Sequence, residues 1–314
     1  VIEDLTFSGT AERRLPSNNL TLNGDFTIDG GATLDVVNDN NIDIEIYGDL
    51  IRTTGNFDAG SDLTNRISFA ASTAQTISGD FTGTNTLNTL ELDNPNGLTL
   101  AGDVDLAEEL ILTDGIITTG GNDLTIALTA TIDPTAGTSS MHIDGALTKV
   151  LNSSGDFTYP VGDNGSIGTI DLVDVNGWGG GTGDFSAQYF FSNPTTDIGS
   201  ALETGINTVS YSEYWEIQAP ASGQGILEIT LDGSSDVANA LSDINDLAIL
   251  GWDGSEWDAV GGNYTITGSA TSGSISCDTD IDFDTYNYFT LGSTETITLI
   301  TASIISGDVE ICDG

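Results

Sequence analysis

A short phrase recurs in the first half of this chain and restricts the folds that it can adopt. The segments 20–26 and 98–104 each read as an alternating strand, a Gly-Asp turn and a further apolar residue, and 44–50 and 76–81 repeat this pattern more loosely. The four turn glycines stand at positions 24, 48, 79 and 102. A period of about 20–30 residues built from strands and turns is typical of a β-solenoid, in which each coil buries its apolar face against the next.

The turns between the strand candidates support this interpretation. Strand candidates of only a few residues continue to residue 143, with Asn-Gly pairs at 23–24 and 96–97 and Asp-Gly pairs at 29–30 and 114–115. Such pairs adopt positive φ at low cost, so the chain can turn every few residues. We therefore predict an all-β protein that begins with a right-handed parallel β-helix (solenoid) over residues 1–143. A Greek-key sandwich is the alternative for this part.

The pattern changes after residue 143. Longer alternating segments with turn signals between them predict an antiparallel β-sandwich over residues 144–296. Residues 297–314 are predicted as a linker and the first strands of a truncated immunoglobulin-like module. Cys277 and Cys312 are the two cysteines, and the sequence leaves open whether they pair.

The charge balance restricts the possible partners. The chain of 314 residues holds 48 acidic and 5 basic residues. Such a field repels phosphate backbones and anionic lipid headgroups, so we expect no nucleic-acid partner. No run of eighteen apolar residues occurs, so we expect no insertion into a membrane. The acidic surface suits either solubility in salty water or the binding of calcium.

Four aspartates near the C-terminal end form the candidate calcium site. Asp278, Asp280, Asp282 and Asp284 alternate with other residues, so in one strand their carboxylates would share a face. Bound Ca²⁺ would relieve their mutual repulsion. The alternative is a solvated strand face. The Gly-Asp turns present a similar choice between a stack of carboxylates that binds calcium and simple turn chemistry, in which each Asp accepts hydrogen bonds from nearby backbone amides.

Three tryptophans are candidates for contact with a ligand. Trp252 and Trp257 flank a four-residue loop, so a hairpin would pair the two indoles across its strands. Exposed indoles in that position could stack on sugars, whereas buried ones would belong to the core. Trp178 precedes three glycines and is the more exposed candidate.

The sequence offers little for catalysis. His142 is the sole histidine and is expected to point outward from a strand. A Ser-His-Asp triad or a Cys-His pair could therefore use only this residue, and a multi-histidine zinc site has no second histidine. Carboxylates are too abundant for any pair to stand out as a glycosidase site. We therefore predict no catalytic residues.

Part of the chain resembles the repeat regions of giant secreted, adhesin-like surface proteins of the type IX secretion system. The matching segments are 69–79, 87–94, 97–100, 110–119 and 124–126. Segments 144–163, 214–217 and 250–257 are similar to the junction and sandwich that follow such repeats. The resemblance implies an extracellular, cell-surface protein without catalytic residues.

From these observations we predict a non-catalytic segment of a large secreted cell-surface protein that acts as an adhesive or stalk module. Its partners would be surface glycans, other cell-surface proteins and neighbouring modules of its own chain. The first alternative is a β-helix enzyme acting on polysaccharide. The second is a subunit of an extracellular filament, joined by solenoid ends or by a donated strand.

Overall fold

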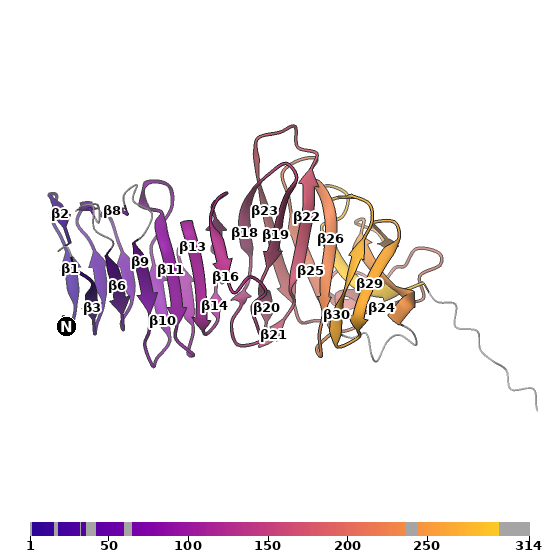
Figure 1. Ribbon diagram of the computed structural model, residues 1–314, viewed down its shortest axis with the longest axis horizontal. Helices are drawn as coiled ribbons and strands as arrows, with labels where there is room; N and C mark the ends of the chain where they lie inside the picture. Colours follow the sequence, from indigo (N-terminus) through magenta and orange to yellow (C-terminus); the bar gives the residue numbers. More distant parts are fainter. Residues whose placement is uncertain are drawn as a thin grey trace, which may run out of the picture.

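Short parallel strands stack along the long axis of the molecule, as the repeated phrase predicts (Figure 1). The computed structural model describes residues 2–15, 18–31, 33–35, 42–59, 65–235 and 244–294. The chain is all-β and contains a β-solenoid of about six turns. The predicted all-β class and the solenoid are therefore confirmed.

Three parallel sheets form the sides of the solenoid. The nine-stranded sheet contains, in spatial order, β1 (Leu5–Phe7), β4 (Phe26–Ile28), β7 (Leu50–Arg52), β10 (Gln75–Ser78), β12 (Leu98–Ala101), β14 (Ile117–Thr118), β17 (Ile143–Asp144), β20 (Val161–Asp163) and β21 (Ser166–Ile167), of which the last pairs antiparallel. The three-stranded sheet contains β2 (Glu12–Arg14), β5 (Thr33–Asp35) and β8 (Asn56–Asp58).

The third side of the solenoid is the beginning of a fourteen-stranded sheet, called here the long sheet. Its parallel strands are β3 (Leu20–Leu22), β6 (Asp43–Ile46), β9 (Arg66–Phe69), β11 (Leu87–Asp93), β13 (Val104–Asp114), β15 (Leu124–Ile126) and β18 (Leu147–Asn152), with β16 (Thr131–Asp133) beside β13. The register places Leu20 beside Ile44 and Ile67 beside Leu90, so one coil takes 23–24 residues here. Leu and Ile at these positions are buried, because alternate residues of each strand face the interior.

The four Gly-Asp turns lie at two different corners of the solenoid. Gly24 and Gly48 follow strands of the long sheet, whereas Gly79 and Gly102 follow strands of the nine-stranded sheet. The two glycines at each corner are one coil apart. The longer interval between Gly48 and Gly79 arises because these two residues lie at different corners. Sequence reasoning had treated all four as one series.

At each corner the turns stack on one another, and the aspartates join successive coils. Asp25 accepts a hydrogen bond from the backbone N–H of Asp49 at 2.9 Å, and Asp103 accepts one from the N–H of Asp123 at 2.9 Å. The carboxylates therefore follow the turn chemistry that the sequence analysis offered as an alternative to calcium, with amides of the next coil as donors. We expect each such bond to contribute about 1.5–3 kcal/mol, because the acceptor is charged.

The long sheet continues beyond the solenoid with antiparallel strands. β18 pairs in parallel with β15 on one side and antiparallel with β23 (Thr182–Phe190) on the other. After β23 come β25 (Tyr214–Gln218), β32 (Tyr288–Ser293), β27 (Leu247–Trp252) and β28 (Trp257–Ala259), with β24 (Thr208–Val209) beside β32. An antiparallel six-stranded sheet contains β19 (Gly155–Tyr159), β22 (Ile170–Asn176), β26 (Gln224–Leu231), β30 (Ser272–Cys277) and β29 (Tyr264–Ser269), with β31 (Ile281–Asp282) beside β26.

Helical structure in the described residues is limited to three short elements. They are the 3₁₀ turns η1 (Gly83–Asn85) and η2 (Ile244–Asp246) and the α-helix α1 (Pro194–Asp197). None of the helices in this part of the chain has the length and hydrophobicity to span a membrane. The predicted linker and immunoglobulin-like strands at 297–314, with Cys312, lie outside the described residues, whereas Cys277 is buried as a free thiol.

His142 differs from its predicted outward orientation. It is fully buried at a bend before β17, and its Nδ1 lies 3.1 Å from the carbonyl oxygen of Thr138. Removal from water lowers the pKa of the imidazole below its ordinary value, because the charged form loses more hydration than the neutral form. The outward assignment was wrong because this residue belongs to a bend and not to a regular alternating strand.

The burial of His142 gives a direct prediction. Because it is the sole histidine, its ring carbon-bound protons give one isolated set of NMR signals. We expect these signals to titrate with a pKa below about 6.5. Between that pKa and 6.5 the unfolded chain binds more protons than the folded chain, so this residue makes stability fall as the pH falls through that range. A titration at or above 6.5 would contradict the buried position.

Candidate functional site

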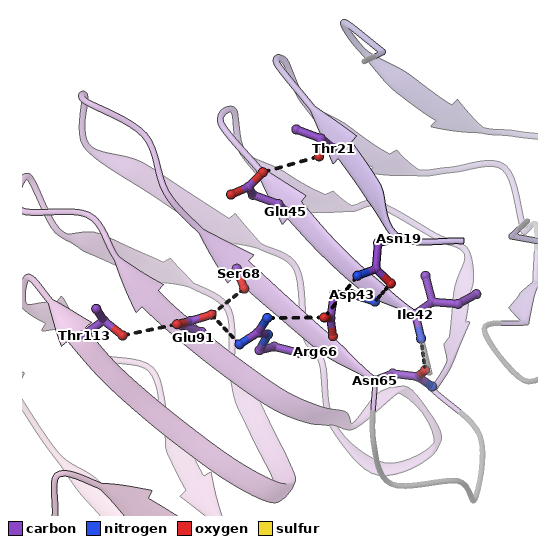
Figure 2. Close-up of polar contacts among 10 residues, drawn as sticks. All are labelled: Asn19, Thr21, Ile42, Asp43, Glu45, Asn65, Arg66, Ser68, Glu91 and Thr113. Atoms are coloured by element: carbon purple, nitrogen blue, oxygen red, sulfur yellow. Dashed lines mark hydrogen bonds and ion pairs between the residues drawn. The ribbon is translucent and has the colours of Figure 1, made fainter. Parts of the chain in front are cut away.

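The outward face of the long sheet carries two rows of side chains across the solenoid, all of them polar except Ile111. We call this surface the polar face, and Figure 2 shows part of it. Strand alternation places apolar residues inside and their neighbours outside, and the parallel register then aligns the outward residues from coil to coil. The first row is Thr21, Glu45, Ser68, Glu91, Ile111 and Asp133. The second row is Asp43, Arg66, Thr89, Glu109 and Thr131.

Hydrogen bonds between neighbouring coils order these side chains. Thr21 donates to Glu45 at 3.3 Å, Ser68 donates to Glu91 at 2.7 Å, and Thr113 donates to the other oxygen of Glu91 at 3.2 Å (Figure 2). Neighbouring strands are about 4.8 Å apart, which suits such short contacts. The result is a regular, ordered surface that offers both hydroxyl donors and carboxylate acceptors.

Arg66 is the cation at the centre of the polar face. Its two terminal nitrogens lie 3.3 Å from Asp43 and 3.0 Å from Glu91, which come from the two adjacent strands (Figure 2). Its Nε is buried and makes no hydrogen bond. The side chain is 36% exposed, so solvent screens the ion pairs and they add little to stability. Their main effect is to hold the guanidinium between the two carboxylates.

A cavity of about 560 Å³ opens on this face beside Arg66. Besides Asp43 and Arg66, its wall contains residues from the next coils: Thr89, Glu108, Glu109, Ile111, Thr129 and Thr131. This volume falls in the range of small-molecule sites. The cavity can bind a ligand rich in hydroxyl groups. Its carboxylates accept hydrogen bonds, its guanidinium donates them, and its hydroxyl groups can do both. Sequence reasoning did not single out Arg66, although the scarcity of basic residues made each one informative.

The four aspartates predicted to bind calcium do not share one strand face. β30 ends at Cys277, and only Ile281 and Asp282 of the following segment form a strand. Asp278 accepts hydrogen bonds from the backbone and side chain of Asn263, and Asp280 accepts one from the Asn176 side chain at 2.9 Å. Within the described ranges no group of three or more His, Cys, Asp or Glu residues is arranged to hold a metal.

The other two aspartates of this set stabilise turns. Asp284 accepts a hydrogen bond from the backbone N–H of Ser222 at 2.7 Å. Asp282 accepts bonds from the N–H of Asp284 at 3.0 Å and from the hydroxyl of Thr285 at 3.3 Å. The four carboxylates therefore act as acceptors for different segments, which the alternating spacing alone did not indicate.

The tryptophan hairpin has the predicted form. Trp252 and Trp257 are opposite each other in the β27–β28 pair, with ring centroids 5.4 Å apart. Trp257 is completely buried and donates from Nε1 to the carbonyl of Gly199 at 2.7 Å, whereas Trp252 is half-buried. Trp178 is also half-buried and packs edge-on against Phe185. Trp252 and Trp178 thus keep part of their surface available to a ligand, and the structure does not bring them together with the polar face.

Comparisons with known proteins identify no related protein. No protein-family model, no curated protein and no solved structure matches this chain. The functional argument therefore depends on the geometry of the chain itself.

Proposed function

We propose that this chain is a non-catalytic segment of a large secreted cell-surface protein, in which it acts as a stalk that also carries an adhesive face. The observation that supports this most is the continuity of the long sheet. β18 joins the parallel solenoid to the antiparallel strands within one hydrogen-bonded sheet, and one cluster of buried apolar residues extends from Leu15 to Leu291. An elongated body with a continuous core resists bending at the point where separate modules would hinge.

Contacts between the six-stranded sheet and the antiparallel strands of the long sheet support a β-sandwich within this proposal. Tyr159 of the six-stranded sheet donates to the carbonyl of Phe185 in the long sheet at 2.9 Å. Trp215 of the long sheet donates to the carbonyl of Gly168 at 2.7 Å. The ring of Phe185 contacts that of Phe283 at 6.4 Å. We infer from these contacts that the two antiparallel sheets pack face to face, with a right-handed solenoid before them and the immunoglobulin-like strands after them.

The polar face is the adhesive surface in this proposal, and surface glycans are its partners. Glycans present many hydroxyl groups, which match the mixed donors and acceptors around Arg66. Single contacts of this kind are weak, but many copies on one cell surface raise the avidity. An extracellular, cell-surface location and export by a type IX system follow from the resemblance described above.

The adhesive role is tested by binding of protein-coated beads to glycan-coated surfaces. We expect Arg66→Ala to reduce retention about tenfold, which corresponds to about 1.4 kcal/mol in the overall binding free energy. Arg13→Ala is the matched control, because it removes the same charge from an exposed position on β2. Equal retention of both variants would contradict an adhesive polar face. Release of unsaturated products from acidic polysaccharides would favour the enzyme alternative.

Calcium remains a prediction, and thermal melting tests it. A calcium site at the four aspartates would raise the melting temperature in about 1 mM Ca²⁺, the affinity range of extracellular modules, above that in a magnesium salt of equal ionic strength. Asp280→Asn should remove this difference. Equal melting temperatures in the two salts would contradict the prediction.

A further inference from the structure

A second cavity lies where the solenoid meets the six-stranded sheet. Its volume is about 590 Å³, and its wall includes Leu128, Ile132, Leu151, Phe157, Leu172 and Lys149. Leu128 at this cavity is 39% exposed. The cavity therefore presents a mainly apolar surface to solvent, and it shares only Thr129 and Thr131 with the cavity beside Arg66.

Two unpaired strand edges border this cavity. Among the described residues, β16 pairs with β13 alone, and β19 is the terminal strand of the six-stranded sheet, where it pairs with β22 alone. Both strands contribute to the cavity wall, through Thr131 and Ile132 and through residues 155–158. An open edge presents N–H and C=O groups that can pair with an added strand.

Lys149 fixes the segment that leads into β16. Its buried ammonium donates to the carbonyl oxygens of Ala127, Leu128 and Ala130 at 2.5, 3.1 and 2.6 Å, and it lies 5.3 Å from the ring centroid of Phe157. These bonds hold the 127–130 turn against β18. The edge of β16 is therefore preformed, which lowers the entropic cost of binding a strand.

We propose that this cavity accepts a β-strand donated by residues 297–305 of a second copy of the chain. The donor segment, Ile-Thr-Leu-Ile-Thr-Ala-Ser-Ile-Ile, has no charged residue and no proline in a chain with a net charge of −43. It lies outside the described residues. Uncharged, β-prone segments of this kind pair readily with open edges.

The strand register keeps Ile297 of the same chain away from the cavity, so the segment 297–305 as a whole cannot enter the cavity of its own copy. Lys149 of β18 pairs with Phe185 of β23. Four residues further along β23, Tyr189 pairs with Trp215 of β25, which in turn pairs with Phe289 of β32. Ser293 lies four residues beyond Phe289 in the same direction. Eight residues at about 3.4 Å each place it about 27 Å from the level of Lys149, and three strand spacings separate the two sideways. Three residues from Thr294 span only about 10 Å.

Each copy would then donate one strand and accept another at a different site. Such heterologous contacts do not close on themselves unless the rotation permits a ring, so they produce filaments. Repulsion between acidic copies opposes this assembly at low ionic strength, and salt screens it. We therefore expect assembly to increase with salt.

Sedimentation of the full chain over a wide range of concentrations tests the proposal. We expect concentration-dependent assembly at about 0.5 M NaCl. Leu128→Asp should weaken it at least tenfold, and Tyr211→Asp, which places the same charge on a side chain that is 63% exposed elsewhere, should not. Circular dichroism of both variants checks that each one folds. A monomer at all concentrations, or equal assembly of the two variants, would overturn the proposal.

A pair of donor variants tests the strand itself. Leu299→Asp and Ile300→Asp place the same charge on adjacent residues, which face opposite sides of a strand. We expect one of the two to prevent assembly and the other to permit it. Loss in both variants or in neither would overturn donation as a strand. Arg66 does not line this cavity and Leu128 does not line the cavity beside Arg66, so a failure of assembly leaves the glycan-retention result for Arg66→Ala unaffected.

Discussion

Replacing Gly48 by alanine should lower the free energy of unfolding by about 3 kcal/mol, because the corners of successive coils touch through their backbones. A Cβ at Gly48 would lie 2.5 Å from the carbonyl oxygen of Gly24 and from Oδ1 of Asp25. Both neighbours are held by inter-coil hydrogen bonds, so neither can move without weakening the stack. Chemical denaturation measures the change.

Gly121 provides the control for this substitution. It lies in a solenoid turn, and no atom is found within 4 Å of a Cβ placed there. Gly121→Ala should therefore change the free energy of unfolding by less than about 0.5 kcal/mol. Equal effects at the two glycines would show that the corners do not stack tightly.

Replacing Lys149 by methionine should cost about 1–3 kcal/mol, since it leaves buried carbonyl oxygens without their donor. Methionine keeps an unbranched side chain as far as Cε, which can still pack against Phe157, while it removes the three hydrogen bonds. Arg13→Met is the matched control, because it makes the same change in net charge at an exposed position. A similar loss of stability in both variants would indicate that overall charge, and not the buried bonds, is responsible.

Lys149 also makes stability depend on pH in a defined direction. Burial lowers its pKa to about 8, whereas an unfolded lysine has a pKa of about 10.4. Between these values the unfolded chain binds more protons than the folded chain. The free energy of unfolding contributed by this group therefore rises as the pH increases from about 8 to about 10.4. Subtracting the profile of Lys149→Met from that of the unchanged chain isolates this rise, and identical profiles would contradict it.

Several features of the fold follow directly from the sequence. The repeated Leu-Thr-Leu and Ile-Glu-Ile segments predicted inward Leu and Ile with outward polar residues, and the parallel register of β3 and β6 confirms this. The Trp252–Trp257 hairpin was predictable because its strands and loop are adjacent in the chain. Lys149 also left a signal, because it occupies an inward position between Leu147 and Leu151.

Other features depended on contacts between distant segments. The spacing of Asp278, Asp280, Asp282 and Asp284 suggested one face, but their partners include Asn176 and Ser222, which come from other turns. The place of Arg66 between Asp43 and Glu91 depends on which coils are neighbours, and a spacing of 23 or 25 residues is not a local pattern.

The sequence by itself determined that the first part coils and which residues of its regularly alternating strands face the interior, because alternation and turn chemistry act within a few residues. Only the tertiary structure decided that the Gly-Asp turns divide between two corners. It also decided that β18 belongs to both a parallel and an antiparallel ladder, and that β16 and β19 remain open beside a cavity. These features depend on the register between strands that are about twenty or more residues apart, which local patterns do not specify.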